Sequence, residues 1–142
     1  MNTEVTTNFA VKPLVAAVAL AISAVNAYAA PTINQMPGGG KVTACSVPGC
    51  TDFGGVGSPI TGLTNTTLIG IDGKAVITWG GVGAPADGLN PGGFNIGSNG
   101  KLQFSAISSG SAVLNIDASL NPSQIFGTLE ATPVFYGFAP AI

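Results

Sequence analysis

The sequence has no histidine and no arginine, and charge of either sign is scarce. Its 142 residues include four lysines and six acidic residues, which give a formal net charge of −2. Charged residues make up 7 % of the chain, against roughly 25 % in an ordinary soluble domain. A nucleic-acid-binding surface needs clustered basic side chains to neutralise phosphates, so we expect no nucleic-acid partner. The length is that of one domain at most.

Groups that carry catalysis or hold metals are also few. A nucleophilic serine usually needs a neighbouring base, most often histidine, and Lys41, Lys74 and Lys101 lie beside turns, where a solvated lysine is expected. A tetrahedral zinc site takes four ligands, which two cysteines without histidine cannot supply. The acidic residues are scattered and mostly lie near turns, where aspartate commonly bonds local backbone. We therefore expect no enzyme activity, no metal and no cofactor.

Long hydrophobic runs are missing, with one short exception near the start. The apolar run Leu14–Val25 is shorter than the ~20 residues that span a bilayer. It precedes Ala27-Tyr28-Ala29, the small-x-small pattern that signal peptidase cleaves. We predict that residues 1–29 are a signal-peptide helix, cleaved between Ala29 and Ala30, with a membrane anchor or a buried helix as the alternative. The partners at this step are signal peptidase and the general export machinery.

The two cysteines suit an exported protein. Cys45 and Cys50 flank Pro48-Gly49, a turn-forming pair that brings the two sulfurs together. Disulfides persist in oxidising compartments such as the periplasm. We predict a disulfide between them. The alternatives are two free thiols and a redox pair, but the latter normally has two intervening residues.

The rest of the chain has the pattern of short β-strands between turns. Strands are expected at 41–44, 65–72, 75–79, 94–97, 101–106, 112–117, 123–129 and 133–138, with loops at 52–62 and 80–93. Asp72-Gly73 predicts a hairpin turn or a tight corner. No segment after Ala30 has a sustained helical apolar stripe. The fold class is all-β, as a sandwich, barrel or solenoid. The predicted core residues are Trp79, Phe94, Ile96, Leu102 and Phe104.

Several sequence blocks occur in a recognisable order. They begin with Met36-Pro37-Gly38-Gly39-Gly40 and end with the strongest block, Asn121 to Ala131. This order resembles the N-terminal secretion domain of two-partner secretion exoproteins, the filamentous-haemagglutinin family, over residues 31–131. Relative to the family, residues 80–93 are an added loop, and the sequence departs from the pattern after Ala131. The residues that match the motifs are Trp79, Phe94, Asn95, Ile96, Gly97, Asn121, Pro122, Ser123, Gln124, Ile125, Phe126 and Gly127.

The resemblance implies a fold and a role. The fold is a right-handed parallel β-helix with an N-terminal cap, in which residues 30–142 are a filamentous-haemagglutinin-type secretion domain that is incomplete at its C-terminus. The role is that of a secretion signal on a haemagglutinin-like adhesin of a Gram-negative bacterium. The partner is an outer-membrane transporter with periplasmic domains, and the chain passes the periplasm to reach the cell surface or the medium. The matching residues serve structure or transporter recognition.

Two other functions stay open at this stage. One is a free-standing extracellular structural or surface protein, which would need no transporter. The less favoured one is a polysaccharide-active β-helix enzyme, which would need clustered carboxylates. Because the last strands are apolar and charge is scarce, self-association through unpaired strand edges is also expected.

Overall fold

The computed structural model describes residues 28–132 and, for the backbone alone, residues 135–140. All regular secondary structure in these ranges is β-strand, which confirms the all-β prediction. Most of the predicted signal peptide lies outside the described residues, and within them no helix is long and apolar enough to cross a membrane. The strands are β1 (Gly40–Cys45), β2 (Pro59–Ile60), β3 (Thr67–Ile71), β4 (Lys74–Trp79), β5 (Lys101–Ala106), β6 (Ala112–Asp117), β7 (Thr128–Thr132) and β8 (Phe135–Pro140).

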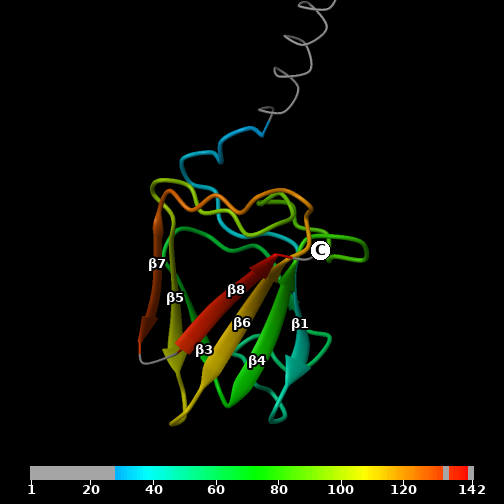
Figure 1. Cartoon of the computed structure of the whole chain (residues 1–142), viewed down its shortest axis with the longest axis vertical. Helices are drawn as coiled ribbons and strands as arrows, with labels where there is room; N and C mark the ends of the chain where they lie inside the picture. The colour runs from blue at the N-terminus through cyan, green and yellow to red at the C-terminus, as the bar shows by residue number, and fades with distance from the viewer. Residues whose placement is uncertain (1–27, 133–134, 141–142) are drawn as a thin grey trace, which may run out of the picture.

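The strands form two sheets between which the chain alternates from β3 onward (Figure 1). One sheet has the order β2-β1-β4-β6-β8 and the other has the order β3-β5-β7. Strands β4, β6 and β8 run parallel to one another, and so do β3, β5 and β7. Two parallel neighbours need a crossover between them. Here each crossover includes a strand of the opposite sheet.

The connections differ in length at the two ends of the strands (Figure 1). At one end Gly73, with φ of +63°, forms the corner from β3 to β4. Because these strands belong to different sheets, Asp72-Gly73 is a corner and the hairpin alternative is wrong. At the other end, residues 80–100 join β4 to β5 and residues 118–127 join β6 to β7. The two motif blocks 94–97 and 121–127 therefore lie at the same end of the molecule.

The core lies between the two sheets. All five predicted core residues are fully buried: Trp79, Phe94, Ile96, Leu102 and Phe104. In the sheet of β3, β5 and β7, inward apolar side chains of neighbouring strands are aligned in register, as Ile69 of β3 is with Phe104 of β5. Such in-register stacking of apolar side chains supplies most of the stabilisation of a sheet with one buried face.

Strand β6 directs the more polar of its two faces toward the core. Val113 and Asn115 are buried, whereas Leu114 is 37 % exposed. The reason lies in β4, because the Nε1 of Trp79 donates a hydrogen bond of 2.9 Å to the Oδ1 of Asn115. A buried indole N–H needs an acceptor, and this strand supplies it at the cost of exposing a leucine.

The predicted strand at 94–97 is wrong, and the one predicted at 123–129 is wrong over its first five residues. Residues 94–97 and 123–127 contain a single bridge, Ile96 to Ile125, instead of a ladder. The final strand of that region, β7, begins only at Thr128. Residues 52–62, predicted as a loop, include the two-residue strand β2. The expected loop 80–93 contains no strand, and the other predicted strands occur within a few residues of their expected bounds.

Candidate functional site

The two motif blocks lie side by side although they are far apart in the sequence. Ile96 and Ile125 form a parallel bridge. The backbone N–H of Ile96 donates to the carbonyl of Gln124 at 3.0 Å, and the N–H of Phe126 donates to the carbonyl of Ile96 at 2.8 Å. The structure therefore brings 94–97 and 121–127 together into one unit, which we call the motif site.

Asp117, the last residue of β6, joins both blocks. Its Oδ2 accepts hydrogen bonds from the backbone N–H of Phe94 at 3.0 Å and from the hydroxyl of Ser123 at 2.6 Å. Its Oδ1 accepts from the N–H of Ser119 at 3.0 Å. One carboxylate thus fixes the start of the first block against the middle of the second.

The surroundings of Asp117 favour its charged form. Partial burial raises the pKa of this carboxyl, but the hydrogen bonds from Ser119, Ser123 and Phe94 outweigh it, and the net pKa lies below the ordinary value. Hydrogen bonds to a carboxylate stabilise it relative to the acid. The carboxylate is therefore ionised wherever the protein is near neutral pH, and it keeps all three donors bound.

Close backbone packing explains the two glycines of the motif site. A Cβ on Gly97 would collide with the carbonyl of Thr32, and a Cβ on Gly127 would collide with the carbonyls of Gly97 and Gly100. The N–H of Gly97 donates to the carbonyl of Gln35 at 2.8 Å. These glycines let three segments of backbone approach closely, which side chains would prevent.

Asn95 and Gln124 make the remaining specific contact between the blocks. The Oδ1 of Asn95 accepts a hydrogen bond of 2.8 Å from the backbone N–H of Gln124. Asn121 and Pro122 are exposed. In front of them, Leu120 has φ of +65° and an exposed fraction of 82 %. A left-handed backbone is uncommon for a leucine, so the hydrogen bonds around Asp117 hold this turn in place.

The outer surface of the motif site includes large apolar side chains. Ile125 is 40 % exposed and Phe126 is 60 % exposed, and Leu120 precedes them on the same segment. Below this surface, the rings of Trp79 and Phe94 pack edge to face with centroids 5.4 Å apart. The motif site therefore combines a buried aromatic ring, Phe94, with large exposed hydrophobic side chains. Such side chains in one segment mark an interaction surface more often than isolated ones do.

The predicted disulfide is present, and the residues of the predicted cleavage site are exposed. Cys45 and Cys50 are joined, with their Cα atoms 5.6 Å apart. Cys50 is fully buried. Ala29 and Ala30 are exposed and belong to no strand. An exposed, unpaired segment is what a peptidase needs at its cleavage site.

The aspartates of the described residues bond backbone N–H groups and serine hydroxyls near turns. Asp87 accepts from the N–H groups of Gly62, Leu89 and Asn90. Asp72 accepts from the hydroxyl of Ser108 at 2.6 Å. No group of three or more His, Cys, Asp or Glu within the described ranges is placed to hold a metal ion.

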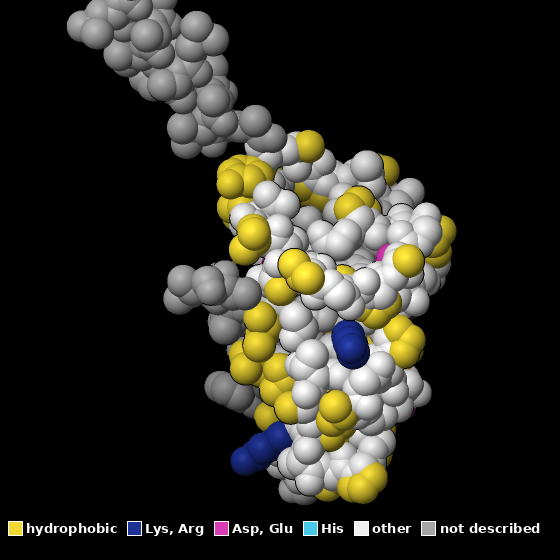
Figure 2. Space-filling model, turned by 90° about the vertical axis from the view of Figure 1, so that its right-hand side faces the viewer, with side chains coloured by type: hydrophobic (Ala, Val, Ile, Leu, Met, Phe, Trp, Pro, Cys, Tyr) yellow, Lys and Arg dark blue, Asp and Glu magenta, His cyan; other side chains and the backbone are white. Residues whose placement is uncertain are grey.

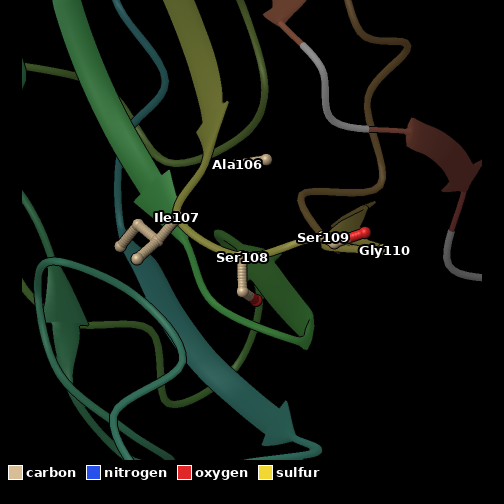
Figure 3. A pocket seen from close by; sticks show the side chains of 5 residues that line it. All are labelled: Ala106, Ile107, Ser108, Ser109 and Gly110. Atoms are coloured by element: carbon tan, nitrogen blue, oxygen red, sulfur yellow. The ribbon is translucent and has the colours of Figure 1, made fainter.

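Two hollows on the surface are lined by neutral residues and one lysine. One, of about 430 Å³, lies beside the turn that follows β5, where Figure 3 shows the side chains of Ile107 and Ser109 pointing away from each other. The other, of about 170 Å³, lies over β1 and β4 and includes Lys41, Thr43 and Thr78. Figure 2 shows this side of the molecule as mostly neutral, with lysine side chains standing apart from one another.

Two residues with specific hydrogen bonds in and around the motif site were not predicted as such from the sequence. Asp117 was expected only as the last residue of the strand at 112–117, and the Asp-x-Ser sequence with Ser119 was the available signal for its hydrogen bonds. Asn90 is 5 % exposed and holds the N–H of Met36 and the carbonyl of Leu63. Its position in a Gly- and Pro-rich loop gives no sign of burial.

Comparisons with protein-family models, with curated proteins and with solved structures find no match to this chain.

Proposed function

We propose that the chain is a secretion-signal domain of the filamentous-haemagglutinin type, recognised by a partner outer-membrane transporter. The observation that carries this proposal is the pairing of the two motif blocks through Ile96 and Ile125. Blocks identified only by their resemblance and their order along the chain are, in space, one continuous site. A chance resemblance of short blocks gives no reason for such a juxtaposition.

We also propose that the fold is a right-handed parallel β-helix with an N-terminal cap. The support is the alternation of parallel strands between two sheets, with the Ile96–Ile125 bridge as the beginning of a third face. Parallel crossovers are right-handed in about 98 % of known cases. The antiparallel strands β1 and β2 cover the first parallel strand, β4, as a cap does.

Export is the localisation that fits the chain best. The disulfide between Cys45 and Cys50 is compatible with an oxidising compartment. The exposed Ala29–Ala30 bond is accessible to signal peptidase. The route is cleavage at the inner membrane, passage through the periplasm, and release at the cell surface of a Gram-negative bacterium.

Co-expression with a two-partner secretion transporter tests the proposal. The released protein should begin at Ala30, and its amount in the medium should fall severalfold when Phe126 is replaced by Ser, because this removes an exposed ring of the motif site. Val82→Ser is the matched control, since Val82 is a fully exposed apolar residue in the 80–93 loop. Emission of the buried Trp79 reports whether each variant is folded. Equal release of all variants with and without the transporter would overturn the proposal.

The same assay separates the main rival. A free-standing surface protein would reach the medium without any transporter, and Phe126→Ser would leave its release unchanged. A β-helix enzyme gains no support from the described carboxylates, because Asp52, Asp72, Asp87, Asp117 and Glu130 are bonded to backbone, serine or lysine partners.

A further inference from the structure

The two sheets each end in a strand with only one neighbour. Among the described residues, β8 pairs with β6 alone and β7 pairs with β5 alone. About half of the N–H and C=O groups of such an edge strand have no partner in the sheet. Since β7 and β8 are consecutive in the chain, both free edges lie on the same side of the molecule (Figure 1). We call this side the open end.

The apolar core reaches the open end. Leu129 of β7 is in register with Leu102 of β5, and Ala131 is in register with Phe104. Leu102 and Phe104 are fully buried, whereas Leu129 and Ala131 are only partly buried and pack against the core from its outer side. The open end is therefore two strand edges with an apolar strip between them.

Charge does not block this surface. The charged side chain on β7 is Glu130, and its Oε2 is 3.0 Å from the Nζ of Lys101 in the neighbouring strand. By sequence, β8 has no charged residue. Native sheets discourage edge pairing with unpaired charges, bulges or very short edge strands. On β7 the one charge is already neutralised by a neighbour.

We propose that the open end binds the open end of a second copy of this chain, forming a two-fold dimer through β7 and β8. A partner must offer two strand edges flanking an apolar strip to fill this surface. A single extended peptide could pair with one edge only, and would leave the other edge and the strip exposed. A second copy presents the same arrangement, and a two-fold axis lets both edges pair at once. This contact uses up the surface on each partner, so assembly stops at two.

Sedimentation velocity over a range from low micromolar to near-millimolar protein tests this proposal. The mass should rise from that of one chain to that of two and go no further. Leu129→Lys places a charge in the apolar strip and should abolish the dimer, whereas Leu68→Lys on β3 should not. Leu68 is already 56 % exposed, so its replacement is a matched change outside the open end. All variants keep residues 1–29 unchanged, so any association caused by that segment is common to them.

Hydrogen exchange of the unmodified chain provides the second measurement, in case Leu129→Lys does not fold. Amides of β7 and β8 should become more protected as the concentration rises, while those of β3 should not change. A monomer at every concentration, polymers that grow without limit, or concentration-dependent protection at the motif site instead of β7 and β8 would each overturn the proposal. The proposal does not depend on secretion, so its failure leaves the proposed function standing.

Discussion

The two edges of each sheet differ in whether the chain covers them. At the N-terminal edges, the chain covers its own strands with irregular structure. There, β3 is flanked by the loop after Cys50, in which the N–H of Gly70 donates to Asp52 at 2.6 Å and the N–H of Asp72 donates to the carbonyl of Cys50 at 2.9 Å. At the C-terminal edges, β7 and β8 have no such cover among the described residues.

In the other sheet, the first parallel strand, β4, is also covered by earlier residues. It is covered by β1, whose pairing with β4 is interrupted by an irregularity between Val42 and Ala44. Beyond β1 lies the two-residue strand β2, which begins with Pro59. A bulge, a short strand and a proline are recognised means of preventing edge-to-edge pairing. The comparison shows that residues 40–60 protect the N-terminal edges, whereas among the described residues the later strands β7 and β8 have no such cover.

The largest expected loss of stability distinguishes Leu102 from Leu129, two leucines that are aligned in neighbouring strands. Leu102→Ala should lower the free energy of unfolding by about 2–5 kcal/mol, because it leaves a cavity in a fully buried site. Leu129→Ala at the open end should cost clearly less, since water already reaches that side chain in part. Urea denaturation of the two variants measures the difference. Equal losses would mean that the open end is as well covered as the interior.

The second largest loss of stability is expected when Asp117 is replaced. Asp117→Ala removes the acceptor of the Phe94 N–H, the Ser119 N–H and the Ser123 hydroxyl, and should cost about 1–3 kcal/mol. Because its pKa is lowered on folding, the charged group stabilises the fold above its unfolded pKa of about 3.9. That stabilisation is lost as the pH falls through the lower folded value. Asp117→Ala should therefore show a weaker acid dependence of stability than the parent, and an unchanged dependence would contradict the assigned hydrogen bonds.

Removing the disulfide should have a smaller effect, confined to the protected edge. The Cys45–Cys50 loop is short, so its closure stabilises the fold by about 2 kcal/mol at most. Replacing both cysteines by serine should lower the thermal midpoint and increase hydrogen exchange in β3, with β7 unaffected. A loss of protection at β7 as large as that at β3 would show that the two edges are not independent.

The smallest effect is expected at Asp52. Asp52→Ala frees the N–H of Gly70 on β3 and should cost about 1 kcal/mol or less, because the carboxylate is exposed. Its more informative consequence is a new unprotected edge. Light scattering at high concentration should reveal association beyond the dimer in this variant. If the variant remains identical to the parent in light scattering, then the backbone contacts of the loop are sufficient to protect β3.

Local patterns in the sequence predicted those parts of the fold that local chemistry decides. The period-two alternation of β5 correctly placed Leu102 and Phe104 in the core. The Pro-Gly turn between the cysteines correctly predicted the disulfide. In these cases the decisive neighbours lie within a few residues, so the sequence alone contains the relevant information.

The motif site was less predictable, because its backbone groups bind partners far away in the sequence. Ile125 and Phe126 have strand-like side chains, yet no ladder forms before Thr128. The N–H of Gln124 is taken by a side chain, that of Phe126 by Ile96, and that of Thr128 by Gly100. The inward position of Asn115 likewise depends on Trp79 in another strand. No periodicity within a single segment records such contacts.

The pairing of the strands also determines the order in which they can fold. From β5 onward, each strand pairs with the strand two places earlier in the chain, so that Lys74 of β4 aligns with Ala112 of β6, and Ala112 aligns with Phe135 of β8. Every such contact closes a long loop, and folding rates fall as the sequence separation of contacts grows. The strands after β4 cannot find a template until the preceding turn of chain is in place. Folding is therefore expected to be slow and to proceed as a zipper from the covered end, with a direction that matches the order in which the chain is made.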